Sequence, residues 1–320
     1  MELAELWEYV NLYLNGMPTY RLRRSKMGME PEEALRLYRE MILGLPEPKD
    51  VRVIHLQKWE ETGPFAALIK RIKQAFGGMS GSVVLMGSLA DRSSTGYSDV
   101  DMAYFPQDKE MTVSFVRMRR ALRNATRTIL SFDHLQHHGI FVIPAETAAH
   151  HSPLPPSAFH GAVVLQGENE ITLGGWRMSW KRDLPPILEK LATLAEKPRL
   201  RPWNLYGIKL LLSQIMLLPT LFLSTVEEDV PKPDSFVKIK KIFPNDCAAI
   251  DLASQMRMEW KRPESRVFRT GIALTPSPWD FAFVARRLFR PGNELIYSLD
   301  ERFYRAAGQL AKRMRDALEG

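Results

Sequence analysis

The stretch from residue 83 to residue 105 constrains this chain most strongly, because it reads as two strands joined by a polar loop. The first strand, Val83–Met86, is wholly apolar and ends at the dipeptide Gly87-Ser88. After ten further residues come Asp99 and Asp101, which open a second apolar run. Residues i and i+2 of a strand project from the same face. We therefore expect the carboxylates of Asp99 and Asp101 to lie side by side.

Two neighbouring carboxylates repel each other unless a cation lies between them. A divalent metal ion that also binds substrate phosphates is the usual solution. The backbone N–H groups and the hydroxyl of Gly87-Ser88 could receive those phosphates. The alternative is that these residues have no binding function and form only a polar turn followed by a solvent-exposed strand end. We favour the metal site because the paired acids, the turn and the apolar strand agree with one another.

This pattern resembles the nucleotidyltransferase superfamily typified by DNA polymerase β, in which an apolar strand ends in Gly-Ser or Gly-Gly and the next strand carries Asp-apolar-Asp. The resemblance is close over residues 83–105 and looser over 65–145. It implies that Asp99 and Asp101 bind the metal. It also implies four nucleotide-binding residues in this region, which are Gly87, Ser88, Arg92 and Ser98.

The resembled family carries a third carboxylate on a later strand, which completes the metal site or acts as the base. We predict Asp133 for this role, as a metal ligand and a catalytic acid–base group; a turn residue after a helix is the alternative. The strongest apolar strand nearby, Gly139–Pro144, contains no acid. If that strand is the matching one, the third acid is missing, and His137 or His138 substitutes for it. The local density of histidines also leaves a zinc site open.

In template-independent members of the resembled superfamily, a lysine and a serine of a second domain hold the triphosphate across a cleft. Lys232 and Ser235 are the corresponding residues here, at the start of a predicted helix. A helix N-terminus beside an ammonium group attracts a polyanion. The alternative is that Asp234 or Ser235 only caps this helix.

Hydrophobic periodicity predicts helices before residue 46, alternating strands and helices up to about residue 175, and mainly helices thereafter. We expect an α+β fold, with a small mixed β-sheet and flanking helices as a polymerase-β-like core, followed by a helical domain. The predicted parts are an N-terminal helical lead-in (1–50), a catalytic domain (51–180) and a C-terminal helical domain (181–320). Further expectations are a basic loop at 21–26, one edge strand at 51–59, one long helix at 109–130 and a hairpin of 162–166 with 170–173.

Composition narrows the class of protein. Hydrophobic residues make up 45% and charged residues 25% of the chain, as in soluble globular proteins. The single cysteine, Cys247, excludes an internal disulfide framework and fits a reducing cytoplasm. The acidic N-terminus does not resemble a secretory signal. Polar residues and a proline interrupt the most apolar run, 210–226, so we expect a core helix and no membrane partner. A net charge of +7 favours polyanionic partners.

The resemblance implies a metal-dependent transferase that moves a nucleoside monophosphate from an NTP, such as ATP, to an acceptor hydroxyl and releases pyrophosphate. Magnesium is the expected metal, with manganese as a second possibility, because carboxylate oxygens shared with phosphates suit such ions. The expected acceptor is an RNA end, such as that of tRNA, or a small molecule. Two alternatives are a protein-modifying (AMPylating or toxin-type) enzyme and a nucleotide-binding regulatory protein that has lost turnover.

Overall fold

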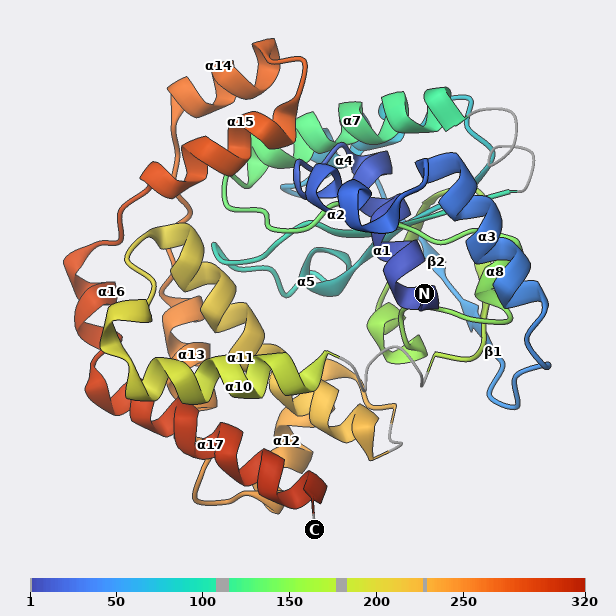
Figure 1. The fold of residues 1–320 in the computed structure, drawn as a ribbon. Coiled ribbons are helices and arrows are strands. Elements are labelled where there is room, and N and C mark those ends of the chain that lie inside the picture. The colour runs from blue at the N-terminus through green and yellow to red at the C-terminus, as the bar shows by residue number, and fades with distance from the viewer. Residues whose placement is uncertain (1, 108–114, 177–182, 227–228, 320) are drawn as a thin grey trace. The chain divides into compact units, whose positions relative to one another are not determined.

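The computed structural model describes residues 2–107, 115–176, 183–226 and 229–319. These residues form two compact units (Figure 1). Unit 1 consists of Met1–Ser94, Ser98–Trp176 and Pro263–Ala285, and unit 2 of Thr95–Tyr97, Arg177–Arg262 and Arg286–Gly320. Unit 1 contains a mixed β-sheet with helices, so the predicted α+β class is confirmed.

A five-stranded sheet forms the centre of unit 1, and its strand order is β2-β6-β3-β4-β5. β3 and β4 are antiparallel, with Met86 opposite Asp101, whereas β5 runs parallel to β4. The site-bearing segment 83–105 therefore lies on central strands, as its apolar sequence predicts. The strand bounds are β2 (Gln57–Lys58), β3 (Gly81–Met86), β4 (Asp101–Pro106), β5 (Phe141–Val142) and β6 (Val163–Gln166).

Alternate residues of β3 enter two different cores, as the period of two in a strand requires. Val83 and Leu85 pack with helices on one face of the sheet (Figure 1). Val84 and Met86 pack on the other face with residues such as Phe159. The helices of the first face are α1 (Leu3–Asn15), α3 (Pro31–Leu43), α4 (Ala66–Ala75) and α7 (Phe115–Phe132). The predicted lead-in, residues 1–50, thus contributes to the core of unit 1.

Local sequence signals explain several helix limits. Pro31 occupies the first turn of α3 with two glutamates beside it, and Gly44 follows its last residue. The basic segment 21–26, expected as a loop, is instead inside α2 (Thr19–Met27). Arginine and lysine are good helix formers, and Gly28 ends the helix with a positive φ of 66°. Of the long helix predicted at 109–130, residues 109–114 lie outside the described part.

The segments flanking the main sheet pair differently from the prediction. The expected edge strand at 51–59 is two strands, β1 (Arg52–His55) and β2, separated by buried Leu56. The expected hairpin of β6 and β7 (Glu170–Leu173) is wrong, because β7 pairs with β1 in a separate two-stranded sheet. Gly167 has φ +93°, a conformation that turns the chain out of the main sheet directly after β6.

Two buried asparagines of α1 cover the free edge of β5. Asn11 accepts a hydrogen bond from the N–H of Val142 at 2.7 Å and donates to its carbonyl at 3.1 Å. Asn15 makes the same pair of bonds with Ile140, both at 2.8 Å. Side-chain amides thus satisfy backbone groups that an edge strand would otherwise expose. These four hydrogen bonds hold strand β5, which directly follows the segment that contains His137 and His138.

Unit 1 also includes a late segment of the chain. α14 (Arg266–Leu274) and α15 (Pro278–Ala285) pack against α7, although the sequence placed them with the helical domain. Arg127 of α7 donates to the carbonyl of Thr275 at 2.7 Å. The ring of His134 stacks on Phe268 with centroids 4.4 Å apart. The remaining short elements of unit 1 are α5 (Gly87–Ala90), α8 (Ala145–Ala148) and η1 (Pro156–Phe159).

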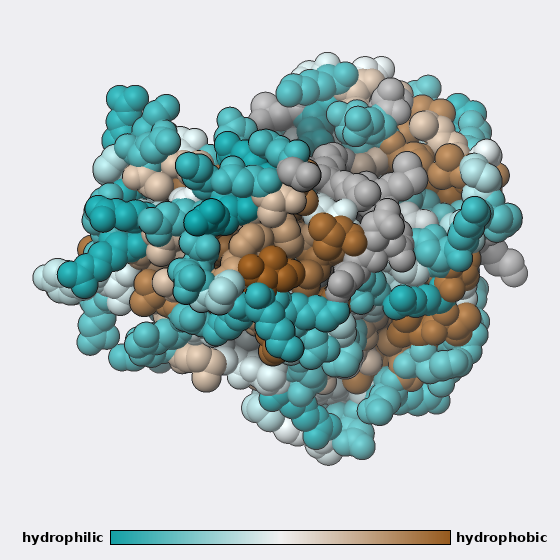
Figure 2. All heavy atoms as spheres, turned by 90° about the horizontal axis from the view of Figure 1, so that it is seen from below, coloured by the Kyte–Doolittle hydropathy of each residue, from teal (hydrophilic) through white to brown (hydrophobic). Residues whose placement is uncertain are grey.

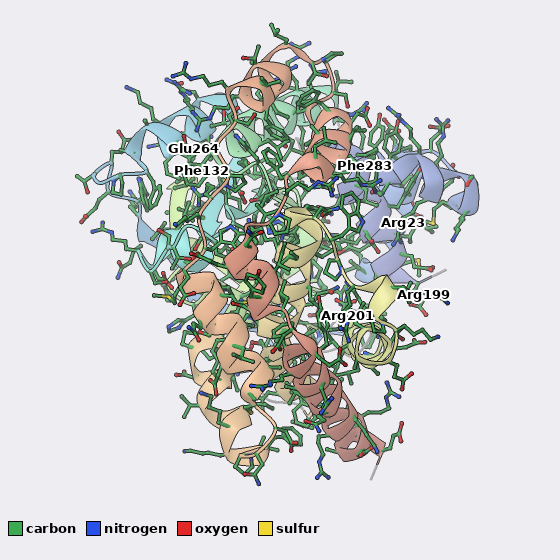
Figure 3. All side chains as sticks on the ribbon, turned by 90° about the vertical axis from the view of Figure 1, so that its left-hand side faces the viewer. Arg23, Phe132, Arg199, Arg201, Glu264 and Phe283 are labelled. Atoms are coloured by element: carbon green, nitrogen blue, oxygen red, sulfur yellow. The ribbon has the colours of Figure 1, made fainter. Side chains whose placement is uncertain are left out.

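Unit 2 is helical in the part that the structure describes. Arg201 joins two of its helices, since it donates to the carbonyl of Leu194 at 3.0 Å and to Glu301 at 2.8 Å (Figure 3). Its guanidinium also lies 4.1 Å from the ring centroid of Tyr304. The elements are α10 (Leu184–Glu196), η2 (Pro198–Leu200), α11 (Leu205–Thr225), α12 (Lys232–Ile242), α13 (Ala248–Met258), η3 (Arg286–Leu288), α16 (Asn293–Ser298) and α17 (Glu301–Glu319).

Helix α11 is long and apolar enough to cross a membrane, judged by its length and composition. However, 67% of its most apolar stretch is buried. The core helix of a soluble protein has the same length and composition. Hydrophilic side chains cover much of the molecular surface drawn in Figure 2. The burial of α11 agrees with the prediction of a core helix.

Candidate functional site

The turn at Gly87 brings the end of β3 against the start of β4. Gly87 has φ +64°, a conformation that side chains with a Cβ rarely adopt. A Cβ at this position would lie 2.6 Å from Oδ2 of Asp101. A side chain at residue 87 would therefore displace the carboxylate. The pairing of Met86 with Asp101 in the β-ladder maintains this close approach.

Two histidines face the two carboxylates. His137 Nδ1 lies 3.4 Å from an oxygen of Asp99, and His138 Nε2 lies 2.8 Å from an oxygen of Asp101. The side chain of Asp99 is 10% exposed and that of Asp101 is 34% exposed. Asp99, His137 and His138 each offer a ligand atom within 4.8 Å of the other two, so this group could hold a metal ion.

The two carboxylates control the charge of His138. Burial by itself lowers the pKa of the imidazole, since it disfavours the charged form. The hydrogen bond and negative charge of Asp101, together with the charge of Asp99, outweigh burial and raise the pKa to about 9. Without a metal ion, an imidazolium cation at His138 thus partly neutralises the acid pair at neutral pH.

This protonation predicts a pH dependence of stability in the metal-free protein. Because the folded pKa of His138 exceeds its ordinary value of 6.5, the pair stabilises the fold fully below pH 6.5 and less as the pH rises towards 9. The total loss is at most about 3 kcal/mol. Urea unfolding of EDTA-treated protein at several pH values measures it. The same series on His138→Gln should lack this part of the slope, and equal slopes in both proteins would contradict the prediction.

Gln136 holds the aspartate segment and the histidine segment together. Its buried amide accepts from the N–H of Val100 at 3.0 Å and donates to the Val100 carbonyl at 3.2 Å. It also donates to the carbonyl of His138 at 3.1 Å. Val100 lies between Asp99 and Asp101. One side chain therefore fixes the backbone that carries both carboxylates relative to the backbone that carries the imidazoles.

Gln136→Met should leave both backbone groups of Val100 buried without this partner. We expect a loss of about 1–3 kcal/mol in the free energy of unfolding for each group left unsatisfied. The affinity for a divalent ion should fall by about 10–100-fold, as for other residues that orient metal ligands. Urea unfolding and metal titration measure the two effects. Gln74→Met, on the exposed face of α4, is the control and should change neither quantity.

Other residues named by the resemblance lie in different settings. Ser88 donates a hydrogen bond to the hydroxyl of buried Ser98 at 2.8 Å, so these two predicted nucleotide ligands are neighbours. Arg92 is exposed, and its guanidinium lies 3.1 Å from Glu60. Asp133 is buried directly after α7, and its carboxylate accepts from the N–H of Leu135 at 3.0 Å. This hydrogen bond is typical of a turn residue, the alternative role considered for Asp133 in the sequence analysis.

The structure describes Lys232 and Ser235 within unit 2. Lys232 is exposed at the first residue of α12. Ser235 is fully buried, where its hydroxyl donates to the Lys232 carbonyl at 2.7 Å and lies 3.1 Å from the hydroxyl of Thr220. These contacts join α11 to α12 and account for the serine without a ligand. Their role in triphosphate binding stays a prediction.

Sequence reasoning named His137 and His138 as substitutes for a missing acid, as catalytic or phosphate-contacting residues, and within a histidine-rich segment that could bind zinc, but it missed Gln136. The available signal was a run of three polar residues, Gln136 to His138, directly before the apolar strand. Polar side chains at the entrance of a buried strand must find partners. Figure 3 labels Phe132 at the end of α7, where the chain leaves the helix towards this segment.

No protein-family model matches the sequence, and no curated protein matches it.

Proposed function

We propose that this protein is a metal-dependent nucleotidyltransferase with a polymerase-β-like catalytic core in unit 1. The observation that carries the proposal is the contact between the Gly87 turn and the carboxylate of Asp101, with Asp99 two residues earlier. This is the juxtaposition that the resemblance in sequence requires. It is supported by the neighbouring hydroxyls of Ser88 and Ser98.

The residues of the candidate site would have different roles in the proposed reaction. A divalent ion bound by Asp99 and Asp101 would neutralise negative charge on the phosphates. The Gly87-Ser88 turn would bind the terminal phosphates through its N–H groups and hydroxyl. The acceptor oxygen would form a bond to the α-phosphorus, the bond from that phosphorus to pyrophosphate would break, and the acceptor hydroxyl would give its proton to a water molecule. Gln136 would keep the two carboxylates in one orientation.

The donor set fits such an ion. Asp99 and Asp101 would supply carboxylate oxygens, and His137 and His138, which precede the strand parallel to β4, would take the role of the third carboxylate of the resembled family. We propose that NTP is the donor and that the acceptor is an RNA end or a small molecule, as the basic charge favours.

The direct test is incubation with each α-³²P-labelled NTP, a divalent metal ion and a cell extract containing RNA, protein and metabolites. We expect label to appear in an RNA or small-molecule fraction together with release of pyrophosphate. Label in protein would favour the AMPylating alternative instead. The absence of transferred label with every NTP and metal ion would reject the activity.

A regulatory nucleotide-binding protein is the second candidate. The observation that favours it is the place of Asp133, whose carboxylate caps a turn, while the metal-binding group combines Asp99 with two histidines. Such a protein would bind a metal–NTP complex without releasing pyrophosphate. Equilibrium binding of labelled NTP, measured beside the transfer assay, separates the two functions.

A further inference from the structure

We infer that His137 and His138 make this site a mixed nitrogen–oxygen centre, which binds a first-row transition-metal ion in preference to magnesium. The inference adds to the proposed function the class of metal ion that the site binds. It rests on the proposed function only for the catalytic role of that ion. Magnesium prefers oxygen ligands, whereas imidazole nitrogen favours transition ions.

Two distances among the candidate ligand atoms are close to those expected around one ion. Ligand atoms that lie about 2.1 Å from a common ion are separated from each other by roughly 3–3.4 Å. His137 Nδ1 and Asp99 Oδ2 are 3.4 Å apart. His138 Nε2 and Asp101 Oδ1 are 2.8 Å apart and need to open only slightly. His138 also presents a ligand atom within 4.8 Å of both Asp99 and His137.

The orientation of His138 is that of a prepared metal ligand. Its Nδ1 lies 3.0 Å from the carbonyl oxygen of Gly139, which can only accept, so Nδ1 carries a proton. The other nitrogen, Nε2, lies 2.8 Å from Asp101 and donates a proton to it in the metal-free protein, and a bound ion would replace that proton. Metal-binding histidines usually donate their second N–H to a carbonyl or carboxylate in this way. Stacking on Phe141, with centroids 5.3 Å apart, holds the plane of the ring.

The backbone around the histidines is equally fixed. Gln136 binds the carbonyl of His138 at 3.1 Å, and Asn15 of α1 binds Ile140, two residues later. A Cβ on Gly139 would lie 2.3 Å from Oδ1 of Asn15, so only glycine permits this contact. Helix, loop and strand thus hold the backbone that carries the two imidazoles in place before any ion arrives, which lowers the free-energy cost of binding.

Metal binding alone tests the inference, without any nucleotide. EDTA-treated protein is titrated with Mg²⁺, Mn²⁺ and Co²⁺, using Mn²⁺ electron paramagnetic resonance, Co²⁺ absorption and competition for Mg²⁺. We expect Co²⁺ and Mn²⁺ to bind at least about tenfold more tightly than Mg²⁺, with Co²⁺ the tighter of the two. His137→Ala should weaken Co²⁺ binding by at least about tenfold. Equal affinities for Mg²⁺ and the transition ions would overturn the inference.

A spectroscopic measurement on the unmodified protein covers the case in which a histidine variant fails to fold. Electron spin-echo envelope modulation of bound Mn²⁺ should detect coupling to imidazole ¹⁴N, and its absence would overturn the inference. His160→Ala, at an exposed histidine of unit 1, is the matched control and should leave metal affinity unchanged. If the metal binds as expected but no NTP is ever consumed, the proposed activity fails while the metal assignment stands.

Discussion

Asp99→Asn and Asp101→Asn are each expected to lower the rate of nucleotidyl transfer by about a thousandfold or more. In each variant, a neutral amide of the same shape replaces a carboxylate that we propose binds the metal. A loss of about 4 kcal/mol of transition-state stabilisation corresponds to a thousandfold in rate. Single-turnover transfer of labelled nucleotide, with the acceptor identified by the extract experiment, measures the effect. Thermal unfolding should show that the fold persists, since the substitution keeps the side-chain volume.

A control for these variants lies in the same loop. Asp91 is exposed, and its carboxylate accepts from the N–H of Ser93 at 2.9 Å, a bond that asparagine can also accept. Asp91→Asn also removes one negative charge from unit 1 but should leave transfer unchanged. Substantial residual activity in Asp99→Asn or Asp101→Asn, or an equal loss in Asp91→Asn, would contradict the proposed mechanism.

Gly87→Ala should have the second largest effect, because the new Cβ would lie 2.6 Å from Oδ2 of Asp101. The carboxylate must move, and displacement of a reacting group by about 1 Å can reduce a rate by about 100-fold. Alanine at a positive φ also costs about 1 kcal/mol of stability. Transfer rate, metal affinity and urea unfolding should therefore all decrease in this variant.

The two causes can be separated with Gly28→Ala. Gly28 has φ +66°, close to the +64° of Gly87, and nothing lies within 4 Å of its ideal Cβ position. The control should show the backbone cost alone, with metal affinity and transfer rate unchanged. If both variants lose only stability, the contact between residue 87 and Asp101 does not matter for the site.

Local sequence signals were sufficient where a segment's own pattern decides its structure. The apolar run of β3, the proline and acids of α3, and the apolar length of α11 each predicted an element that the structure contains. Local signals did not predict the structure correctly where it depends on which distant strand a segment pairs with. β7 pairs with β1 across more than a hundred residues, and the basic residues of α2 carry no apolar periodicity to mark a helix.

For the candidate site, the sequence by itself predicted the acid pair and determined the turn at Gly87, whose positive φ glycine permits. Strand β4 begins only at Asp101, so strand periodicity does not extend to Asp99. Only the tertiary structure decided what stands opposite the two carboxylates. His137 and His138 reach the carboxylates, and Gln136 reaches the backbone of Val100 between them, because β5 runs parallel to β4 and the α1 asparagines hold its free edge. Asp133 instead caps a turn. Such long-range contacts depend on strand pairing, which the spacing of residues along a single chain does not encode.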